Sequence, residues 1–192
     1  MGKKEAKDIL LEMKNKAELM VDLAYSSVIY DNIELAEEVY ELEDMVDELN
    51  DKLQKLVIRD AIARELEENE ALAIIQLAYC AEAIADAARE IADVELRDIE
   101  LHPIIRESVL ESDEVLVKVK VLSSVLCDKK LGEIDLASNT GMWVIAIKRN
   151  GEWIYNVDKD TVIKEGDIIF ARGAREGVEH FISIAEGREK NI

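Results

Sequence analysis

Residues 143–155 read WVIAIKRNGEWIY, and this stretch decides the fold class of the second half of the chain. Two runs rich in β-branched and aromatic residues, 143–148 and 152–155, flank the pair Asn150-Gly151. Such runs favour strands, and Asn-Gly favours a tight hairpin because both central positions of that turn need positive φ angles. We therefore expect a β-hairpin here.

The sequence on either side of this hairpin predicts a small α/β domain. Before it, residues 115–121 place valine at every second position, as in a strand with one buried face, and residues 123–134 indicate a short helix. After it, residues 167–171 indicate a strand and residues 174–185 a closing helix. The predicted order is β-α-β-β-β-α.

Towards the N-terminus, glycine disappears from the sequence. No glycine lies between Gly2 and Gly132, and Pro103 is the only proline of the chain. A long segment without these residues and rich in Ala, Leu and Glu is helical by propensity. Three amphipathic stretches follow one another: the first begins close to the N-terminus, the second at Asp31-Asn32 and the third near Asn69. We expect an antiparallel three-helix bundle, with Asp31-Asn32 as the N-cap of the second helix.

The apolar rows of these helices define the expected core. Spacings of three and four residues alternate along them, which is typical of long packed helices. Cys80 lies among alanines and is expected to be a small core residue. The rows are Ile9, Leu10, Met13, Ala17, Met20, Val21 and Ala24 in the first helix, Val39, Leu42, Val46, Leu49, Leu53 and Leu56 in the second, and Ile74, Leu77, Ala81, Ile84, Ala88 and Ile91 in the third.

Charge also divides the chain. Residues 1–112 hold 29 acidic and 12 basic residues, whereas residues 113–192 hold 14 and 12. We expect an α+β fold class with two domains: a helical bundle over residues 1–101, a linker helix over 102–112 and the α/β domain over 113–192.

The net charge of −19 restricts the partners of the protein. Such a field repels phosphate backbones and attracts cations and basic protein surfaces, so nucleic acid is not expected. The two cysteines have no metal-binding spacing, and we find no signal peptide. We also find no run of about 18 apolar residues. These features predict a cytoplasmic protein without direct membrane insertion.

The second half resembles the TrkA-C domain, the C-terminal part of the module that regulates potassium channels and transporters. The resemblance rests on three stretches in order: residues 131–136 (LGEIDL), 140–149 (TGMWVIAIKR) and 162–173 (VIKEGDIIFARG). It implies pairing of two copies and binding of a small anionic ligand, such as a cyclic dinucleotide, between them.

The first half resembles one three-helix unit of the PhoU family. Residues 37–49 (EEVYELEDMVDEL) and 81–94 (AEAIADAAREIADV) carry this resemblance. It implies a divalent metal site at Glu43/Asp47 and Glu82/Asp86. Residues four apart share one helix face, so each pair can converge on Mg, Mn, Ca or iron. Acids at this spacing also occur elsewhere in the bundle, and a solvated or salt-bridged face is the alternative interpretation.

Polar and basic residues near the strand ends are the candidate ligand-binding residues of the second half. The alternative for the basic ones is an ordinary solvated strand edge. Trp143 and Trp153 are expected in the core, with a dimer interface as the alternative. The candidates are Asn139, Thr140, Gly141, Lys148, Arg149 and Arg172.

Together these features predict a regulatory protein and not an enzyme, because neither histidine has a Ser, a Cys or a paired acid arranged with it as nucleophile and base. We expect a homodimeric regulatory subunit of a membrane cation transporter or channel, most simply for potassium. The alternative is a PhoU-type metal-binding adaptor in phosphate transport signalling.

Overall fold

The structure is a computed structural model that describes residues 2–97, 99, 114–155 and 157–189. The chain divides into two compact units, residues 1–102 and 103–192, and each is described by itself. The linker helix expected over 102–112 lies outside the described residues.

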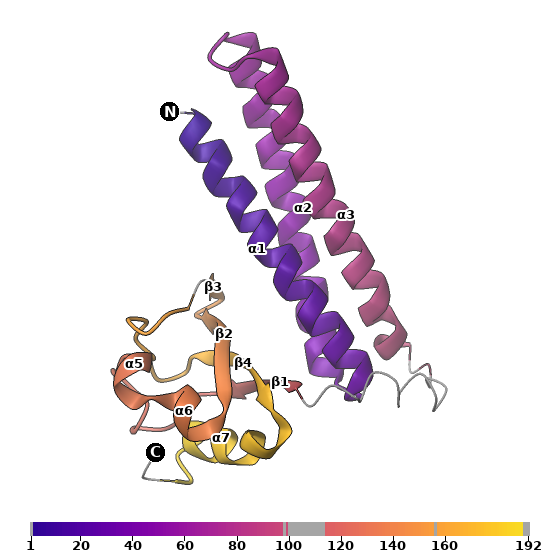
Figure 1. The fold of residues 1–192 in the computed structure, drawn as a ribbon. Helices are drawn as coiled ribbons and strands as arrows, with labels where there is room; N and C mark the ends of the chain where they lie inside the picture. Colours follow the sequence, from indigo (N-terminus) through magenta and orange to yellow (C-terminus); the bar gives the residue numbers. More distant parts are fainter. Residues whose placement is uncertain (1, 98, 100–113, 156, 190–192) are drawn as a thin grey trace. The chain divides into compact units, whose positions relative to one another are not determined.

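The first unit is an antiparallel three-helix bundle, as expected from the absence of helix breakers (Figure 1). It contains α1 (Gly2–Ile29), α2 (Ile33–Ile62) and α3 (Glu68–Leu96), and every helix packs against the other two. Asn32 is the N-cap of α2, where its Oδ1 accepts from the backbone N–H of Leu35 at 3.1 Å. This bond satisfies one of the amide donors left free at a helix start.

The buried row of α3 differs from the predicted row. It consists of alanines, and two of the large residues expected there are exposed: Leu77 by 55% and Ile84 by 47%. Cys80 is also exposed, so its expected place in the core was wrong. α3 carries apolar residues around much of its circumference, and its alanines let the backbone approach α1 and α2 closely. The buried alanines are Ala71, Ala78, Ala81, Ala85, Ala88 and Ala92.

By length and composition alone, α3 could cross a membrane, and 28% of its most apolar stretch is buried in the structure. Core helices of water-soluble proteins meet the same criterion, so this is weak evidence for a span. The expectation of no such stretch overlooked α3 because Glu82 and Asp86 interrupt it.

The second unit is built on a four-stranded antiparallel sheet with the strand order β1-β4-β2-β3. Its strands are β1 (Glu114–Lys120), β2 (Met142–Arg149), β3 (Glu152–Ile154) and β4 (Ile168–Ala174). The predicted hairpin at Asn150-Gly151 is present, and both residues have positive φ angles.

The helix expected over residues 123–134 is replaced by turns and two short helices, α5 (Leu131–Ile134) and α6 (Leu136–Thr140). Asp135 lies between them with a φ angle of 47°, a left-handed conformation that ends one helix before the next begins. The 3₁₀ turn η1 (Arg175–Gly177) precedes the closing helix α7 (Val178–Ala185).

One face of the sheet packs against these helices. Phe181 and Ile184 of α7 share a core with Ile134 and Leu136 of the short helices and with Ile169 of β4. Because side chains alternate along a strand, the neighbours of these sheet residues point to the other face, which we call the second face.

The tryptophans have different environments on the second face. Trp143 is 59% exposed, so its predicted place in the core was wrong. Trp153 packs against Phe170, with ring centroids 4.9 Å apart. A tryptophan in a strand does not reveal which face of the sheet it occupies until the pairing is known.

Candidate functional sites

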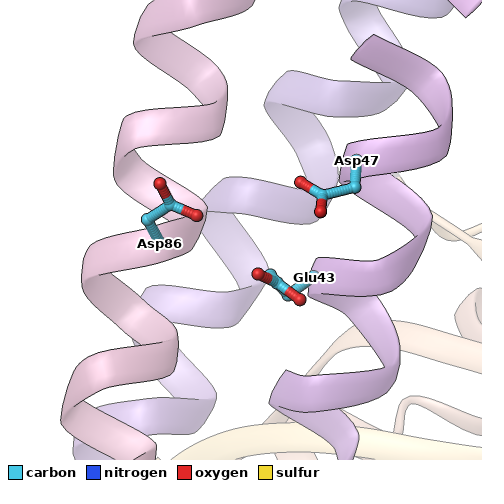
Figure 2. Close-up of side chains that lie close together, drawn as sticks. All are labelled: Glu43, Asp47 and Asp86. Carbon is cyan, nitrogen blue, oxygen red and sulfur yellow. The ribbon is translucent and has the colours of Figure 1, made fainter. Parts of the chain in front are cut away.

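Three carboxylates meet on the surface of the bundle between α2 and α3 (Figure 2). Glu43 and Asp47 lie one turn apart on α2, and Asp86 reaches them from α3. One oxygen of each lies within 4.8 Å of one oxygen of the other two. The structure therefore brings together three of the four residues predicted as metal ligands. Glu82, the fourth, is not among them.

Glu43 is the buried member of this cluster, and its surroundings destabilise its ionised form. It is 5% exposed, and burial is the first cause that raises the pKa of its carboxyl, followed among the raising causes by Asp47. Arg89 opposes this shift, with its Nη1 3.0 Å from Glu43 Oε1. The guanidinium thus pairs with one of the three carboxylates, and an added cation would relieve the repulsion that Asp47 and Asp86 exert on Glu43.

Tyr40 contacts Arg89, and Asp93 in turn holds Tyr40. The guanidinium lies over the Tyr40 ring, 5.6 Å from its centroid, and the Tyr40 hydroxyl donates to Asp93 at 2.9 Å. Burial, followed by the bond to Asp93, raises the pKa of Tyr40. These contacts hold Arg89 beside Glu43 and leave Asp47 and Asp86 exposed.

The donor set fits a hard divalent cation. It offers only carboxylate oxygens, which Mg²⁺, Mn²⁺ and Ca²⁺ prefer, and two of its three members are exposed to water that could complete the coordination. The bundle sequence over residues 2–97 contains no histidine, which makes the set unsuited to zinc.

In the second unit, the residues that carry the sequence motifs hold the backbone in place. Thr140 is buried, and its Oγ1 donates to the Leu136 carbonyl at 2.7 Å and accepts from the Met142 amide at 3.1 Å. Gly141 follows with a φ angle of 71°. A Cβ on Gly173 would lie 2.0 Å from the Gly141 carbonyl oxygen, so β4 can pack this closely against Gly141 only because residue 173 is glycine.

Arg149 is likewise engaged within the domain. Its guanidinium donates to both oxygens of Asp167 at 2.7 Å and to the Val162 carbonyl at 2.8 Å. Asp167 is almost fully buried, and the bond to it is the first cause that raises the pKa of Arg149. This bidentate pair ties β2 to the turn before β4, which leaves Arg149 poorly placed to bind an external ligand.

The six predicted ligand-binding residues fall into two groups at opposite ends of β2. Asn139, Thr140 and Gly141 precede the strand, and Arg172 pairs with Trp143 near the same end. Lys148 and Arg149 lie at the other end, roughly 16 Å away at the rise of a strand. The Lys148 ammonium lies over the Trp153 ring, 5.4 Å from its centroid. The predicted set is therefore not one site.

A groove of about 290 Å³ lies beside the Trp143 end of β2. It is bordered by α5, α6 and the segment around Lys159, and its lining includes Trp143, Asp158 and Lys159. Sequence reasoning missed Lys159 and assigned Trp143 to the core. The exposed Trp143 and the cross-strand Arg172 are the groups best suited to an aromatic, anionic ligand.

Comparison with known families agrees with the two units. A model of the TrkA-C domain matches residues 115–185, and a model of the PhoU domain matches residues 10–94.

Known proteins similar to the chain include two from Methanocaldococcus jannaschii. Potassium channel protein 1 is 30% identical over 104 residues, 52% of this chain and 31% of that protein. Probable potassium channel protein 2 is 27% identical over 95 residues, 50% of this chain and 24% of that protein. The chain thus matches less than a third of the length of either.

A solved structure with a similar domain is the RCK_C domain dimer of S. agalactiae BusR in complex with c-di-AMP. It is 25% identical, covers 40% of this chain and 93% of its own, and has a TM-score of 0.34. The chain consists of an N-terminal PhoU domain and a C-terminal TrkA-C domain and is a distant homologue of potassium channel proteins.

Proposed function

We propose that the protein is a cytoplasmic regulatory subunit of a membrane cation transporter or channel, and that it acts on potassium transport. The TrkA-C domain over residues 115–185 carries this proposal. The similarity to two potassium channel proteins supports the choice of potassium as the transported ion.

The sensing site of this proposal is the Trp143 end of β2. Arg172, whose Nε lies 3.7 Å from Glu114 Oε2, supplies a positive charge on the second face. Trp143, its cross-strand neighbour, offers an exposed ring for stacking on a base. Trp143 also lines the groove that includes Lys159, which offers the ligand a concave surface; Arg172 does not line this groove. A ligand that prefers one state of the protein shifts its equilibrium, typically with 1–3 kcal/mol of coupling to a partner.

Thermal denaturation with cyclic di-AMP tests the site, because this is the ligand that the resemblance to TrkA-C domains implies. At about a hundred times its dissociation constant, the ligand stabilises the native state by roughly 2.7 kcal/mol. Both tryptophans lie in the TrkA-C domain, so their fluorescence reports the transition of this unit alone. We expect Arg172→Ala to abolish the shift.

Lys148→Ala is the matched control, since it removes the same charge at the other end of β2. It should leave the shift intact. Loss of the shift in Lys148→Ala and not in Arg172→Ala would move the site to the opposite end of the strand. If no shift occurs and no cation transporter is captured from detergent-solubilised membranes by the tagged full chain, the proposal is wrong.

The carboxylate cluster favours a second candidate function. Glu43, Asp47 and Asp86 fit a hard divalent cation, and we propose as an alternative that the metal-loaded bundle is an adaptor in phosphate transport signalling. In this case the working part of the molecule is the PhoU domain over residues 10–94.

Circular dichroism at a helix wavelength separates this candidate from the first, because the long helices within the described residues all lie in the bundle. We expect Mn²⁺ to raise the midpoint of the helical transition, and Asp47→Asn or Asp86→Asn to remove that increase. Glu48→Gln, the neighbour of Asp47 on α2, is the control and should respond as the unchanged chain does. An equal Mn²⁺ response in all variants would indicate diffuse binding to an acidic surface.

A further inference from the structure

The flank of α3 next to α1 carries an exposed apolar row that the bundle itself does not use. Its residues alternate spacings of four and three, the pattern of a helix that packs against another long helix. All are exposed except Ile91, which is half-buried. This outer row consists of Ala73, Leu77, Cys80, Ile84, Ala87 and Ile91.

A groove runs between this row and α1. It has a volume of about 440 Å³ and is lined mainly by apolar side chains, among them Leu10 and Leu11 of α1 and Leu77 and Ile84 of α3. Leu11 is 47% exposed. Exposed, contiguous apolar surface of this kind on a folded domain marks an interaction site.

The order of sizes along the outer row fits an antiparallel copy of itself. If two rows cross at the level of residue 82, each large side chain meets a smaller one, which is the arrangement that fills the space between facing helices. The facing pairs are Ala73 with Ile91, Leu77 with Ala87 and Cys80 with Ile84.

The charges bordering the groove fit the same arrangement. Lys14 and Glu18 line it on α1 and form an ion pair of 2.6 Å. A two-fold axis between them would place Lys14 of each copy near Glu18 of the other. A membrane surface fits less well, because residues 1–112 hold 29 acidic and 12 basic residues and would be repelled by anionic lipids.

We propose that the face formed by α1 and the outer row of α3 is an isologous interface, at which two copies of the chain pair with their α3 helices antiparallel. The four helices that meet there form a bundle across the two-fold axis. This interface lies within the PhoU domain and does not depend on the proposed ligand site.

Cross-linking through Cys80 tests the interface directly, because this exposed thiol lies in the middle of the outer row. Cys127 is half-buried, and burial is the first cause that raises its pKa, so it reacts more slowly. We use the full chain with Cys127→Ser. In the proposed register the two Cys80 side chains lie about one helical turn apart, and a short bis-maleimide should join two chains.

Ile84→Cys sharpens the test of register. It places a thiol opposite Cys80 of the second copy, within the range in which a disulfide forms on mild oxidation. We expect a disulfide-linked dimer with this variant. The control combines Cys80→Ser with Ile58→Cys, since Ile58 is 52% exposed on α2 and lies outside the groove. It should remain monomeric on a non-reducing gel.

Leu77→Glu measures how much the outer row of α3 contributes to pairing of the two copies. The charge enters a two-fold interface twice, so we expect the yield of Cys80 cross-links to fall by roughly tenfold or more. Ile58→Glu should leave the yield unchanged. Equal yields from Cys80 and from the α2 control, or an unchanged yield in Leu77→Glu, would overturn the proposal. So would binding of anionic vesicles without any cross-linked dimer. The cyclic di-AMP response of Leu77→Glu separates this result from a failure of the ligand site.

Discussion

The two domains use their charged residues and glycines in opposite ways. In the bundle, the chain needs no glycine between Gly2 and the end of α3, and most acids lie on the surface of helices that would form without them. In the TrkA-C domain, Gly141 and Gly173 allow two segments to touch, and the bidentate pair of Arg149 and Asp167 closes the sheet against a turn.

The difference bears on what a recognisable motif means in each domain. In the TrkA-C domain, the residues that make the family recognisable hold the fold, so their presence does not locate the ligand. In the bundle, the fold follows from an amphipathic pattern that many residues could satisfy. The fold therefore does not require carboxylates at positions 43, 47 and 86, where they can serve a site. Substitutions should distinguish residues that stabilise the fold from residues that bind a ligand or metal.

Arg149→Met should have the largest effect. It leaves Asp167, which is almost fully buried, with only the hydrogen bond from the Lys164 backbone N–H and no charged partner. Loss of one member of a buried ion pair costs about 3–5 kcal/mol of unfolding free energy. Denaturation followed by tryptophan fluorescence should show this loss, whereas the helical transition of the bundle should keep its midpoint. Lys148→Met, which removes the neighbouring cation on β2, is the control. A folded Arg149→Met domain that has lost only ligand binding would break the comparison.

Gly173→Ala should have the next largest effect. Its Cβ would lie 2.0 Å from the Gly141 carbonyl oxygen and 2.8 Å from the Met142 Cα, so backbone must move. Overpacking of this kind costs roughly 1–3 kcal/mol. Gly166→Ala meets no atom within 4 Å and tests only the positive φ angle, which costs about 1–2 kcal/mol. The same fluorescence measurement should rank Gly173→Ala as the less stable variant.

Much of the fold could be predicted from the sequence because it depends on local signals. The hairpin follows from Asn150-Gly151, and the start of α2 follows from Asp31-Asn32, of which Asn32 is the cap. The predictions that were wrong concern which side of a helix or strand a side chain occupies. Leu77 and Ala81 both fit a helical row, and only packing shows that alanine faces inward. For the same reason, Trp143 could not be assigned to a face of the sheet before its register was known.

The candidate sites show the same limit. Glu43 and Asp47 could be predicted to converge because they lie four residues apart on one helix. Their meeting with Asp86 depends on the relative level of α2 and α3, which spacing within one helix does not give. The predicted ligand residues included both ends of β2, because the sequence shows that they are basic but not that roughly 16 Å separates Lys148 from Arg172.

The smallest expected effect concerns the charge of Glu43 in the metal-free bundle. Burial raises the pKa of this carboxyl in the folded state above its ordinary value, so the folded state binds the proton more tightly than the unfolded chain. Its contribution to stability is therefore fully present below the ordinary pKa and is lost as pH rises through the raised value. Metal competes with the same proton, and its affinity should increase over that range.

Urea denaturation of the bundle between about pH 4 and pH 7, followed by circular dichroism, measures both effects. Without metal, Glu43→Gln should lose less stability with rising pH than the unchanged chain does. With Mn²⁺, the unchanged chain should instead gain stability as pH rises, and Glu43→Gln should not. Glu48→Gln, exposed on the same helix, should follow the unchanged chain in both series. If Glu43→Gln and Glu48→Gln cannot be distinguished, the acids of the bundle form a uniform solvated face, and the contrast between the two domains would extend no further than their folds.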